Sequence, residues 1–175
     1  MASPLPLPTV AIIAGAWQNP EHYVPLQDAF AKLSYESVCQ APSSTCPPHG
    51  DTDLAADIAF VSTGLLSLVD PVSLLFHKLT LSETQYWACK IERQAPKPLQ
   101  GIVSYAPFED NFYMGHLAYL RCAEDECVHP PGQAKFIAAA GNEETDELPT
   151  SHLPWLEMAD MTAKRILDLV AKVRM

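Results

Sequence analysis

An acidic residue and a histidine in the second half of the chain have types and spacing that suit proton transfer. Asp125 comes just after a predicted strand at residues 117–122, and His152 follows the next predicted strand, at residues 145–148. The carboxyl ends of parallel strands meet at one edge of a sheet, so both side chains would project there. A carboxylate in that position holds the tautomer of an imidazole and stabilises its protonated form. We expect Asp125 and His152 to form an acid–base pair, and the alternative is that both are solvated loop residues.

Other candidate reactive groups near this pair have weaker support. His129 stands close to Asp125 and competes with His152 for the role of base. Cys127 would need a paired histidine or a helix N-terminus to become a thiolate, and the sequence indicates neither. The five cysteines include no CxxC pair, and no spacing of histidine and acidic residues is typical of a metal site. We therefore expect no metal, no cofactor and a reduced, cytoplasmic protein.

The size and charge of the chain exclude several classes of partner. A length of 175 residues favours a single domain over residues 1–175. The formal net charge is −10 and the lysines and arginines do not cluster, so contacts with the phosphates of a nucleic acid are not expected. The N-terminal residues lack the charged region of a secretory signal, and no apolar run approaches the length of a membrane span. We expect neither a nucleic-acid partner nor a membrane association.

The start of the chain has the pattern of a strand, a helix and a second strand. Residues 10–14 form an unbroken apolar run with β-branched side chains, which is typical of a strand buried on both faces of a parallel sheet. Gly15 permits a sharp turn before a predicted amphipathic helix at residues 21–33. A second strand is predicted around residues 37–39, and a right-handed crossover would make the two strands parallel.

The rest of the pattern completes an α/β fold. Helices are predicted at residues 51–70, from residue 82 onward, at 130–140 and at 158–173. A short extended segment at residues 102–107 and the two strands beside Asp125 and His152 are the other regular elements. We expect a mostly parallel sheet of about four strands flanked by helices.

Most of the chain resembles the α/β-hydrolase superfamily, in its small esterase-like branch. Residues 8–17 look like the first central strand and oxyanion loop of that family, residues 119–133 like its strand, acid and proline-containing turn, and residues 151–156 like its histidine loop. The resemblance implies that Asp125 is the acid and His152 the base of a catalytic triad. It also implies an oxyanion site built by three residues of the first loop, Gly15, Ala16 and Trp17.

The resemblance further implies a cap-like segment at about residues 71–113. Its aromatic side chains would form the apolar wall of a substrate pocket: Phe76, Tyr86, Trp87, Phe108, Phe112 and Tyr113. The alternative for each of these residues is an ordinary place in the core.

The chain departs from the family at the nucleophile. A hydrolase of this kind needs a Gly-x-Ser-x-Gly elbow, and this sequence contains none. The strand that carries the elbow would lie beside the strand at residues 10–14. Without it, that strand and the strand at residues 117–122 face an open position with unpaired backbone groups. We expect these two strands to close on each other, and we expect a homodimer.

Three functions remain open. An acid and a base without a nucleophile favour a non-hydrolytic enzyme of the isomerase, lyase or cyclase type, including one that catalyses a pericyclic reaction. Its substrate would be an apolar, carbonyl-containing small molecule, and the branch that the chain resembles suggests secondary metabolism. The alternatives are an ester or thioester hydrolase in which His152 activates water, and a catalytically silent protein that binds a ligand or a partner.

Overall fold

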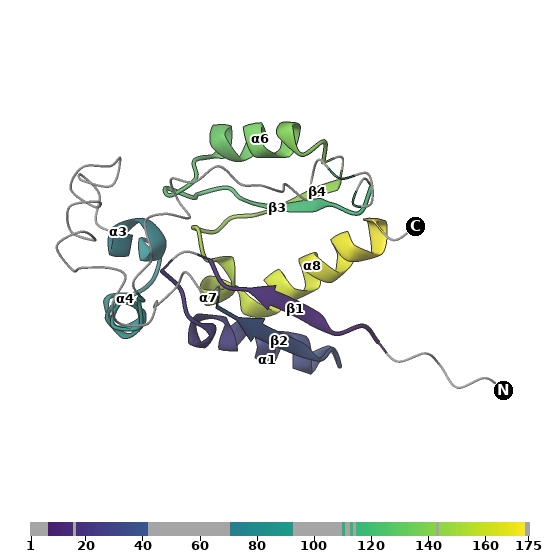
Figure 1. Cartoon of the computed structure of the whole chain (residues 1–175). Helices are drawn as coiled ribbons and strands as arrows, with labels where there is room; N and C mark the ends of the chain where they lie inside the picture. The colour runs from purple at the N-terminus through teal and green to yellow at the C-terminus, as the bar shows by residue number, and fades with distance from the viewer. Residues whose placement is uncertain are drawn as a thin grey trace, which may run out of the picture.

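The computed structural model describes residues 7–15, 17–41, 71–92, 110, 113, 115–142 and 144–173 (Figure 1). The predicted helix at residues 51–70 and the extended segment at 102–107 lie outside the described residues, as do Ala16, Phe108 and Phe112. Helices and parallel strands alternate along the described chain, as an α/β fold requires.

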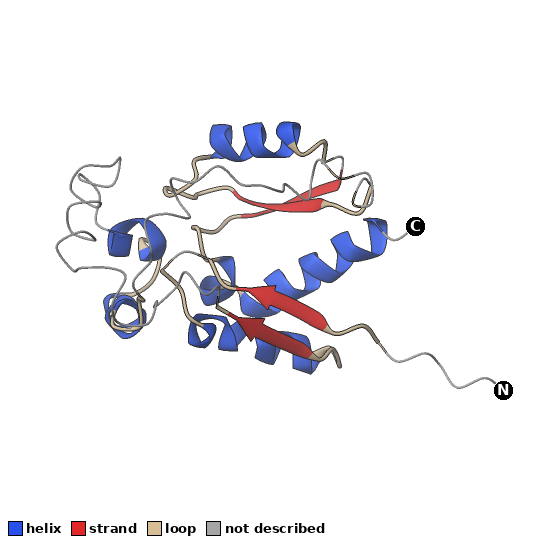
Figure 2. Cartoon of the chain, in the orientation of Figure 1, coloured by secondary structure: helices blue, strands red, loops and turns tan. Residues whose placement is uncertain are grey.

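Four short strands form two parallel pairs (Figure 2). β1 (Val10–Ile13) pairs with β2 (Ser37–Gln40), and β3 (Ala118–Cys122) pairs with β4 (Glu144–Leu148). A helix connects the two strands of each pair, which is the connection that parallel neighbours need. The predicted strands and the parallel pairing of the first two are therefore confirmed.

The connection from β1 to β2 contains two helical segments where the sequence predicts one. η1 (Pro20–Tyr23) is a 3₁₀ helix, and α1 (Val24–Lys32) follows it directly. Pro25 stands in the first turn of α1, and its missing N–H group favours a new helix start at this point. The buried face of α1 carries Leu26, Ala29 and Phe30, at the spacing of an amphipathic helix.

The expectation that the first strand is buried on both faces is wrong. Val10 and Ile12 pack against the core, whereas Ile13 is 68% exposed and Val38 on β2 is 51% exposed. Ala11 lies opposite Val38 in the sheet, so the exposed side chains share one face. An unbroken apolar run does not by itself distinguish a strand with two covered faces from a strand with one open apolar face.

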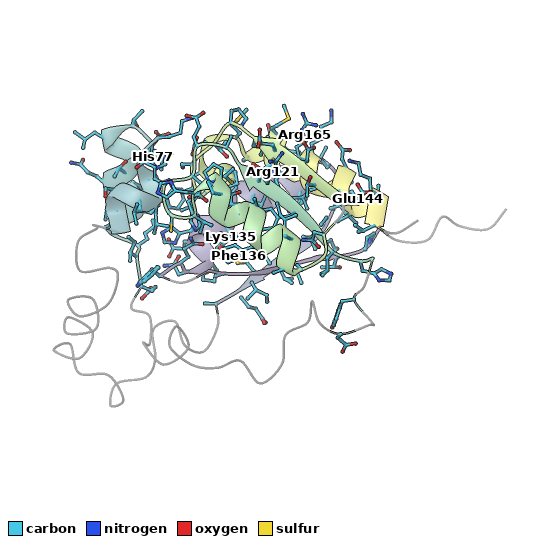
Figure 3. All side chains as sticks on the ribbon, turned by 90° about the horizontal axis from the view of Figure 1, so that it is seen from above. His77, Arg121, Lys135, Phe136, Glu144 and Arg165 are labelled. Carbon is cyan, nitrogen blue, oxygen red and sulfur yellow. The ribbon has the colours of Figure 1, made fainter. Side chains whose placement is uncertain are left out.

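α8 (Ala159–Val173) lies between the two sheets and packs against α1 and both β3 and β4 (Figure 1). Arg165 of α8 forms an ion pair with Asp146 of β4 at 3.1 Å, and Glu144 of β4 lies 3.7 Å from Lys172 of α8. Figure 3 labels Arg165 and Glu144 in a view of the side chains from above. On the other side of the β3–β4 sheet lies α6 (Pro130–Ala139). Both helices begin and end within one residue of the predicted positions.

The expected closure of the first strand on the third is also wrong for the described strands. β1 pairs with β2 and not with β3, and β3 pairs with β4. α8 contacts β3, β4 and α1 at once, and this packing holds the two sheets apart. A cavity lined by residues of both β1 and β3 lies between them.

Two further helices, α3 (Pro71–Phe76) and α4 (Leu81–Ala88), lie beside the sheets (Figure 1). α4 begins where the sequence predicts a helix, because Thr80 and Glu83 form a capping box around its first turn. The sequence predicts no helix at α3, which lies in the cap-like segment. α3 is buried through Leu75 and Phe76, which form a cluster with Leu153.

Candidate functional site

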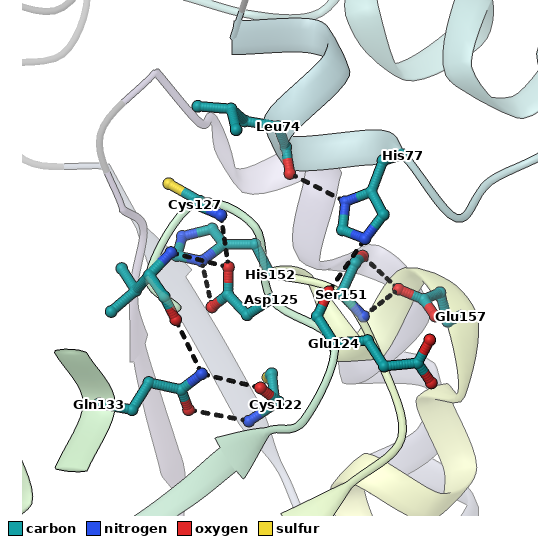
Figure 4. A network of polar contacts seen from close by, with 11 residues as sticks. Leu74, His77, Cys122, Glu124, Asp125, Cys127, Gln133, Ser151, His152 and Glu157 are labelled. Carbon is teal, nitrogen blue, oxygen red and sulfur yellow. Dashed lines mark hydrogen bonds and ion pairs between the residues drawn. The ribbon is translucent and has the colours of Figure 1, made fainter. Parts of the chain in front are cut away.

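The predicted acid and base are in contact. His152 Nδ1 lies 2.9 Å from Asp125 Oδ2, which is a hydrogen-bond distance (Figure 4). Asp125 stands in the loop after β3, and His152 stands between β4 and α7 (Pro154–Glu157). The parallel pairing of β3 and β4 brings these two loops to one edge of the sheet. The structure thus brings the two residues together as the sequence predicts, while their catalytic role stays a prediction.

Asp125 is a buried, ionised acceptor. Its side chain is 5% exposed, and Oδ1 accepts hydrogen bonds from the backbone N–H groups of Cys127 at 2.8 Å and Val128 at 2.9 Å. Burial alone raises the pKa of this carboxyl group, but the hydrogen bonds from His152, Val128 and Cys127 outweigh burial and lower the pKa of Asp125 below its ordinary value. Both carboxylate oxygens are therefore occupied by donors, and the orientation of the group is fixed.

Asp125 determines which ring nitrogen of His152 carries a proton. An ionised carboxylate only accepts hydrogen bonds, so Nδ1 donates and Nε2 of the neutral ring keeps a lone pair. His152 lines the cavity, and its Nε2 has no hydrogen bond to any other described residue. Nε2 is available to take a proton from a bound molecule, and Asp125 stabilises the imidazolium that then forms.

The cavity beside His152 has a volume of about 420 Å³ and lies between the two sheets. It is lined from β1, α1, β3, α7 and α8, and most of the lining side chains are apolar, including Val10, Ile12, Leu120 and Ile166. The volume lies in the range of pockets that bind small organic molecules. An apolar lining with one histidine–carboxylate pair favours a mostly apolar ligand.

Gln133, to which the sequence assigned no role, closes the loop that carries Asp125. Its side-chain amide accepts a hydrogen bond from the N–H group of Cys122 at 3.0 Å and donates to the carbonyl oxygen of Cys122 at 2.7 Å. It also donates to the carbonyl oxygen of Val128 at 2.9 Å (Figure 4). A glutamine in the first turn of a helix resembles any solvated residue in a sequence, so no signal distinguished it.

The residues that precede Asp125 and His152 in the sequence, Glu124 and Ser151, are hydrogen-bonded to other parts of the fold. Glu157 on α7 accepts hydrogen bonds from the N–H group of Ser151, at 2.8 Å, and from its hydroxyl group. His77, in the turn after α3, lies 3.0 Å from the carbonyl oxygen of Glu124. The contact of His77 joins two segments that are far apart in the sequence, and the contact of Glu157 joins α7 to the loop before it. A periodic sequence pattern reveals neither contact.

The loop expected to polarise a substrate oxygen is already engaged in the fold. The N–H group of Gly15 donates to Tyr23 Oη at 2.9 Å, and the hydroxyl of Tyr23 donates to Gln18 Oε1. Neither Gly15 nor Trp17 lines the cavity, and Ala16 lies outside the described residues. An oxyanion role for this loop stays a prediction.

Tyr23 lines the cavity and lies in η1, within the predicted amphipathic helix at residues 21–33. Its ring stacks on that of Trp155 with centroids 4.6 Å apart, and both residues line the cavity. Burial raises the pKa of Tyr23 to about 12, so its phenol stays protonated at neutral pH. Tyr23 is therefore an uncharged side chain in the cavity wall, and its hydroxyl oxygen accepts the hydrogen bond from Gly15.

Two aromatic residues of the cap-like segment belong to a core beside the site. Phe76 is 1% exposed and stacks on the buried ring of His22, with centroids 6.3 Å apart. Trp87 lies on the same histidine, at 5.5 Å between centroids. This is the ordinary core place that stood as the alternative to a pocket wall.

The other four aromatic residues of this set do not meet the cavity within the described structure. Tyr86 and Tyr113 are exposed and do not line it. Phe108 and Phe112 lie outside the described residues. A substrate-binding role for the aromatic set stays a prediction.

Neither the nearby cysteines nor the second histidine competes with His152. Burial raises the pKa of Cys127, and it raises the pKa of Cys122, which lines the cavity, to about 11. Both are therefore thiols rather than thiolates at neutral pH. His129 is exposed, precedes α6 and does not line the cavity. His152 is better placed than His129 to act as a base there.

No model of a known protein family matches this chain, and no curated protein matches it. None of the described helices combines the length and the apolarity needed to cross a bilayer. Within the described ranges, no three or more histidine, cysteine, aspartate or glutamate side chains gather as a metal site. The function is therefore inferred from the geometry around His152.

Proposed function

We propose that this protein is a non-hydrolytic enzyme that moves a proton within an apolar, carbonyl-containing small molecule, as isomerases, lyases and some cyclases do. The observation that carries the proposal is the 2.9 Å contact between His152 Nδ1 and Asp125 Oδ2 at the wall of a largely apolar cavity. A histidine oriented in this way is suited to general acid–base catalysis, which contributes on the order of 10²–10⁴-fold to a rate.

The proposed chemistry gives a role to each ring nitrogen of His152 and to the carboxylate of Asp125. Nε2 of His152 takes a proton from a carbon next to the substrate carbonyl, and the electrons of the broken C–H bond move into an enolate. Asp125 stabilises the imidazolium through the hydrogen bond to Nδ1. The same proton then returns to the original carbon, to another carbon or to a leaving group, and the histidine is neutral again.

Within the part of the chain that the structure describes, the groups beside this pair favour proton transfer over acyl transfer. The sequence has no Gly-x-Ser-x-Gly elbow. Ser151 stands next to His152 in the sequence, but its hydroxyl donates to Glu157. Among the described residues that line the cavity there is no serine, and its cysteine, Cys122, has a pKa raised by burial. An ester hydrolase that activates water with His152 is the runner-up.

The proposal includes an abridged α/β-hydrolase-like domain with a remnant cap, in which the four described strands form two parallel pairs. The order of the described elements supports it, because an acid follows β3 and a histidine follows β4. α3 and α4 would represent the remnant cap. A cytoplasmic place in secondary metabolism, an apolar substrate and a homodimeric state are further parts of the same proposal.

Deuterium exchange tests the reaction class without knowledge of the natural substrate. Apolar ketones are incubated with the protein in D₂O, and the loss of hydrogen next to the carbonyl is followed by NMR. We expect His152→Ala to lower the protein-dependent exchange on the order of 10²-fold or more, and His129→Ala to leave it unchanged. Exchange that is the same with and without His152 contradicts the proposal.

A chromogenic ester distinguishes the alternatives in the same preparation. Hydrolysis that depends on His152, without any ketone exchange, favours the hydrolase. The silent binding protein predicts neither reaction and a biological activity that survives both His152→Ala and Asp125→Ala.

A further inference from the structure

The cavity beside His152 lies along one edge of β1. All four residues of that strand line it, from Val10 to Ile13, and no residue of the fully described β2 does. Successive side chains of a strand point to opposite faces of the sheet, so a cavity that meets all four lies at the edge of the strand and not over one face. β2 occupies the other edge of β1. The cavity therefore lies where a further strand would continue the sheet.

The backbone of β1 presents hydrogen-bonding groups to this edge. The N–H group of Val10 donates to the carbonyl oxygen of Glu36 at 2.8 Å, on the side of β2. In a parallel pair alternate residues turn their N–H and C=O groups toward the same neighbour, so those of Ala11 and Ile13 point to the opposite edge, along the cavity. None of the described strands pairs with that edge. The cavity wall thus contains backbone donors and acceptors that have no strand partner.

The opposite wall of the cavity is also a strand edge. Leu120 and Cys122 of β3 line it. The N–H group of Ala123 donates to the carbonyl oxygen of Leu148 at 2.9 Å, so by the same alternation the backbone groups of Leu120 and Cys122 point away from β4. Those of Cys122 are bonded to the side chain of Gln133, and those of Leu120 have no partner among the described strands.

Gln133 shows which chemical group fits such an edge. Its side-chain amide accepts from the N–H group of Cys122 at 3.0 Å and donates to the carbonyl oxygen of the same residue at 2.7 Å. These are the two hydrogen bonds that a residue of an added antiparallel strand forms with the residue opposite. An amide is therefore already the partner of one edge of the cavity. Ala11 and Ile13 offer the same pairs of donor and acceptor on the other edge.

The side chains around the cavity restrict the rest of the ligand. Most of them are apolar, and no lysine or arginine is present among the described residues that line it. The ionised Asp125 repels a second carboxylate, and a free acid would enter without a counter-ion. The volume of about 420 Å³ suits a small molecule. The ligand is therefore short, uncharged and apolar apart from its amide groups.

We propose that the cavity binds a short, uncharged, apolar peptide in an extended conformation. Its amide groups pair with the backbone of Ala11 and Ile13 as an added strand does, and its apolar side chains contact the two walls. The position of one ligand carbonyl beside His152 rests on the proposed function. The pairing with β1 rests on the strand edge alone.

Capped dipeptides measure this pairing directly. The first probe has two leucine side chains, an acetyl group at one end and a methylamide at the other. One matched probe has an ester in place of the central amide, which removes one N–H donor and keeps the shape. Another has a free carboxylate in place of the methylamide. Binding is measured by isothermal calorimetry on the full chain, and the exchange of single backbone N–H groups with D₂O is followed by NMR.

We expect the capped dipeptide to bind about tenfold more tightly than its ester, because one hydrogen bond is lost in the ester. The probe with the carboxylate should bind more weakly than the capped dipeptide. Bound dipeptide should slow the exchange of the N–H groups of Ala11 and Ile13. Those of Val10 and Ile12 are the control, because they face β2 and are protected with or without a ligand.

A proline in β1 tests the same edge from the side of the protein. Ala11→Pro removes one N–H group that points along the cavity and no hydrogen bond to β2, and it should weaken dipeptide binding about tenfold. Ser37→Pro is the matched control, because the N–H group of Ser37 points to the outer edge of β2 and the residue does not line the cavity. It should leave the affinity unchanged. The comparison of dipeptide and ester on the unsubstituted chain requires no variant to fold.

Equal affinity for the capped dipeptide and its ester overturns the inference, and so does the absence of binding by the capped dipeptide. The two proposals fail separately. If the chain prefers the dipeptide over the ester but no ketone exchange depends on His152, the peptide site stands and the proposed reaction does not. If exchange depends on His152 and the two affinities are equal, the reaction stands and the peptide site does not.

Discussion

Gln133 forms two hydrogen bonds with the backbone of Cys122, at 3.0 Å to the N–H group and 2.7 Å to the carbonyl oxygen. Cys122 is the last residue of β3, and Asp125 follows in the next turn. The side chain of Gln133 is thus a link between α6 and the end of the strand, and a third hydrogen bond, to Val128, closes the loop around the acid. The position of Asp125 thus depends on a residue that does not hydrogen-bond Asp125 and does not line the cavity.

Replacement of Gln133 by leucine should destabilise the protein strongly. Gln133→Leu leaves up to three backbone groups without their partner, and each buried unpaired group costs about 1–3 kcal/mol. We expect the free energy of unfolding in urea to fall by about 2–5 kcal/mol. Gln85→Leu, on an exposed face of α4, is the control and should change it by less than about 0.5 kcal/mol. An unfolding midpoint unchanged by Gln133→Leu would contradict this account of the loop.

Replacement of Asp125 by asparagine should prevent His152 from acting as a base while the hydrogen bonds that hold the loop are kept. The side-chain oxygen of asparagine can still accept from Cys127 and Val128, but its NH₂ group would donate to Nδ1 of His152. The neutral ring then carries its proton on Nε2, which can no longer accept one.

The protein-dependent ketone exchange is the readout for Asp125→Asn. We expect the rate to fall on the order of 10²–10⁴-fold while the affinity for the ketone changes little. The control is Glu126→Gln, which removes an exposed carboxylate next to Asp125 and should leave the rate unchanged. A rate that survives in Asp125→Asn would show that Asp125 does not set the tautomer of His152.

The sequence predicts the acid–base contact from the positions of two residues after two predicted strands. β3 is mostly apolar, whereas β4 is a short polar segment that ends at Leu148, and Asp125 and His152 each follow one of these strands. Parallel pairing then leaves one arrangement in which both side chains reach the same edge of the sheet.

The supporting contacts could not be predicted because no periodic pattern encodes them. Gln133 and Glu157 act through side-chain hydrogen bonds to Cys122, Val128 and Ser151, and no regular spacing in the sequence marks either residue. The spacing between the sheets also depends on how α8 packs against β3, β4 and α1 at once, which is a tertiary effect that strand patterns do not contain. This is why the closure of β1 on β3 was expected and is not found.

His22 should make the stability of the protein depend on pH below neutrality. The residue is fully buried, and its Nε2 lies 3.3 Å from the carbonyl oxygen of Trp87, at the end of α4. Burial lowers the pKa of His22 below the ordinary value of about 6.5, against the opposing effect of its hydrogen bonds to Trp87 and Asn19. The charged groups near it are Lys90 and Glu21, which form an ion pair with each other.

The sign of the effect follows from proton uptake. Just below pH 6.5 the unfolded chain binds a proton at His22 and the folded chain does not, so stability rises with pH across this window. We expect urea midpoints to be highest above about pH 6.5 and to fall toward pH 5. His22→Gln should remove its share of this slope, and His116→Gln, at an exposed position, should keep it. A slope that is identical in the two variants would exclude His22 as its source.

The open face of the β1–β2 sheet is the reason to expect a homodimer. Ile13 and Val38 share this face and are 68% and 51% exposed, and its association with a second copy would remove their apolar surface from water. Sedimentation equilibrium should give twice the chain mass, and Ile13→Lys should shift the protein to the monomer. Leu81→Lys is the control, because Leu81 is 75% exposed but lies on α4, away from the sheet, and should leave the dimer intact. If the unsubstituted protein is a monomer at every concentration tested, the expectation is contradicted, because no second copy then covers the open face of the β1–β2 sheet.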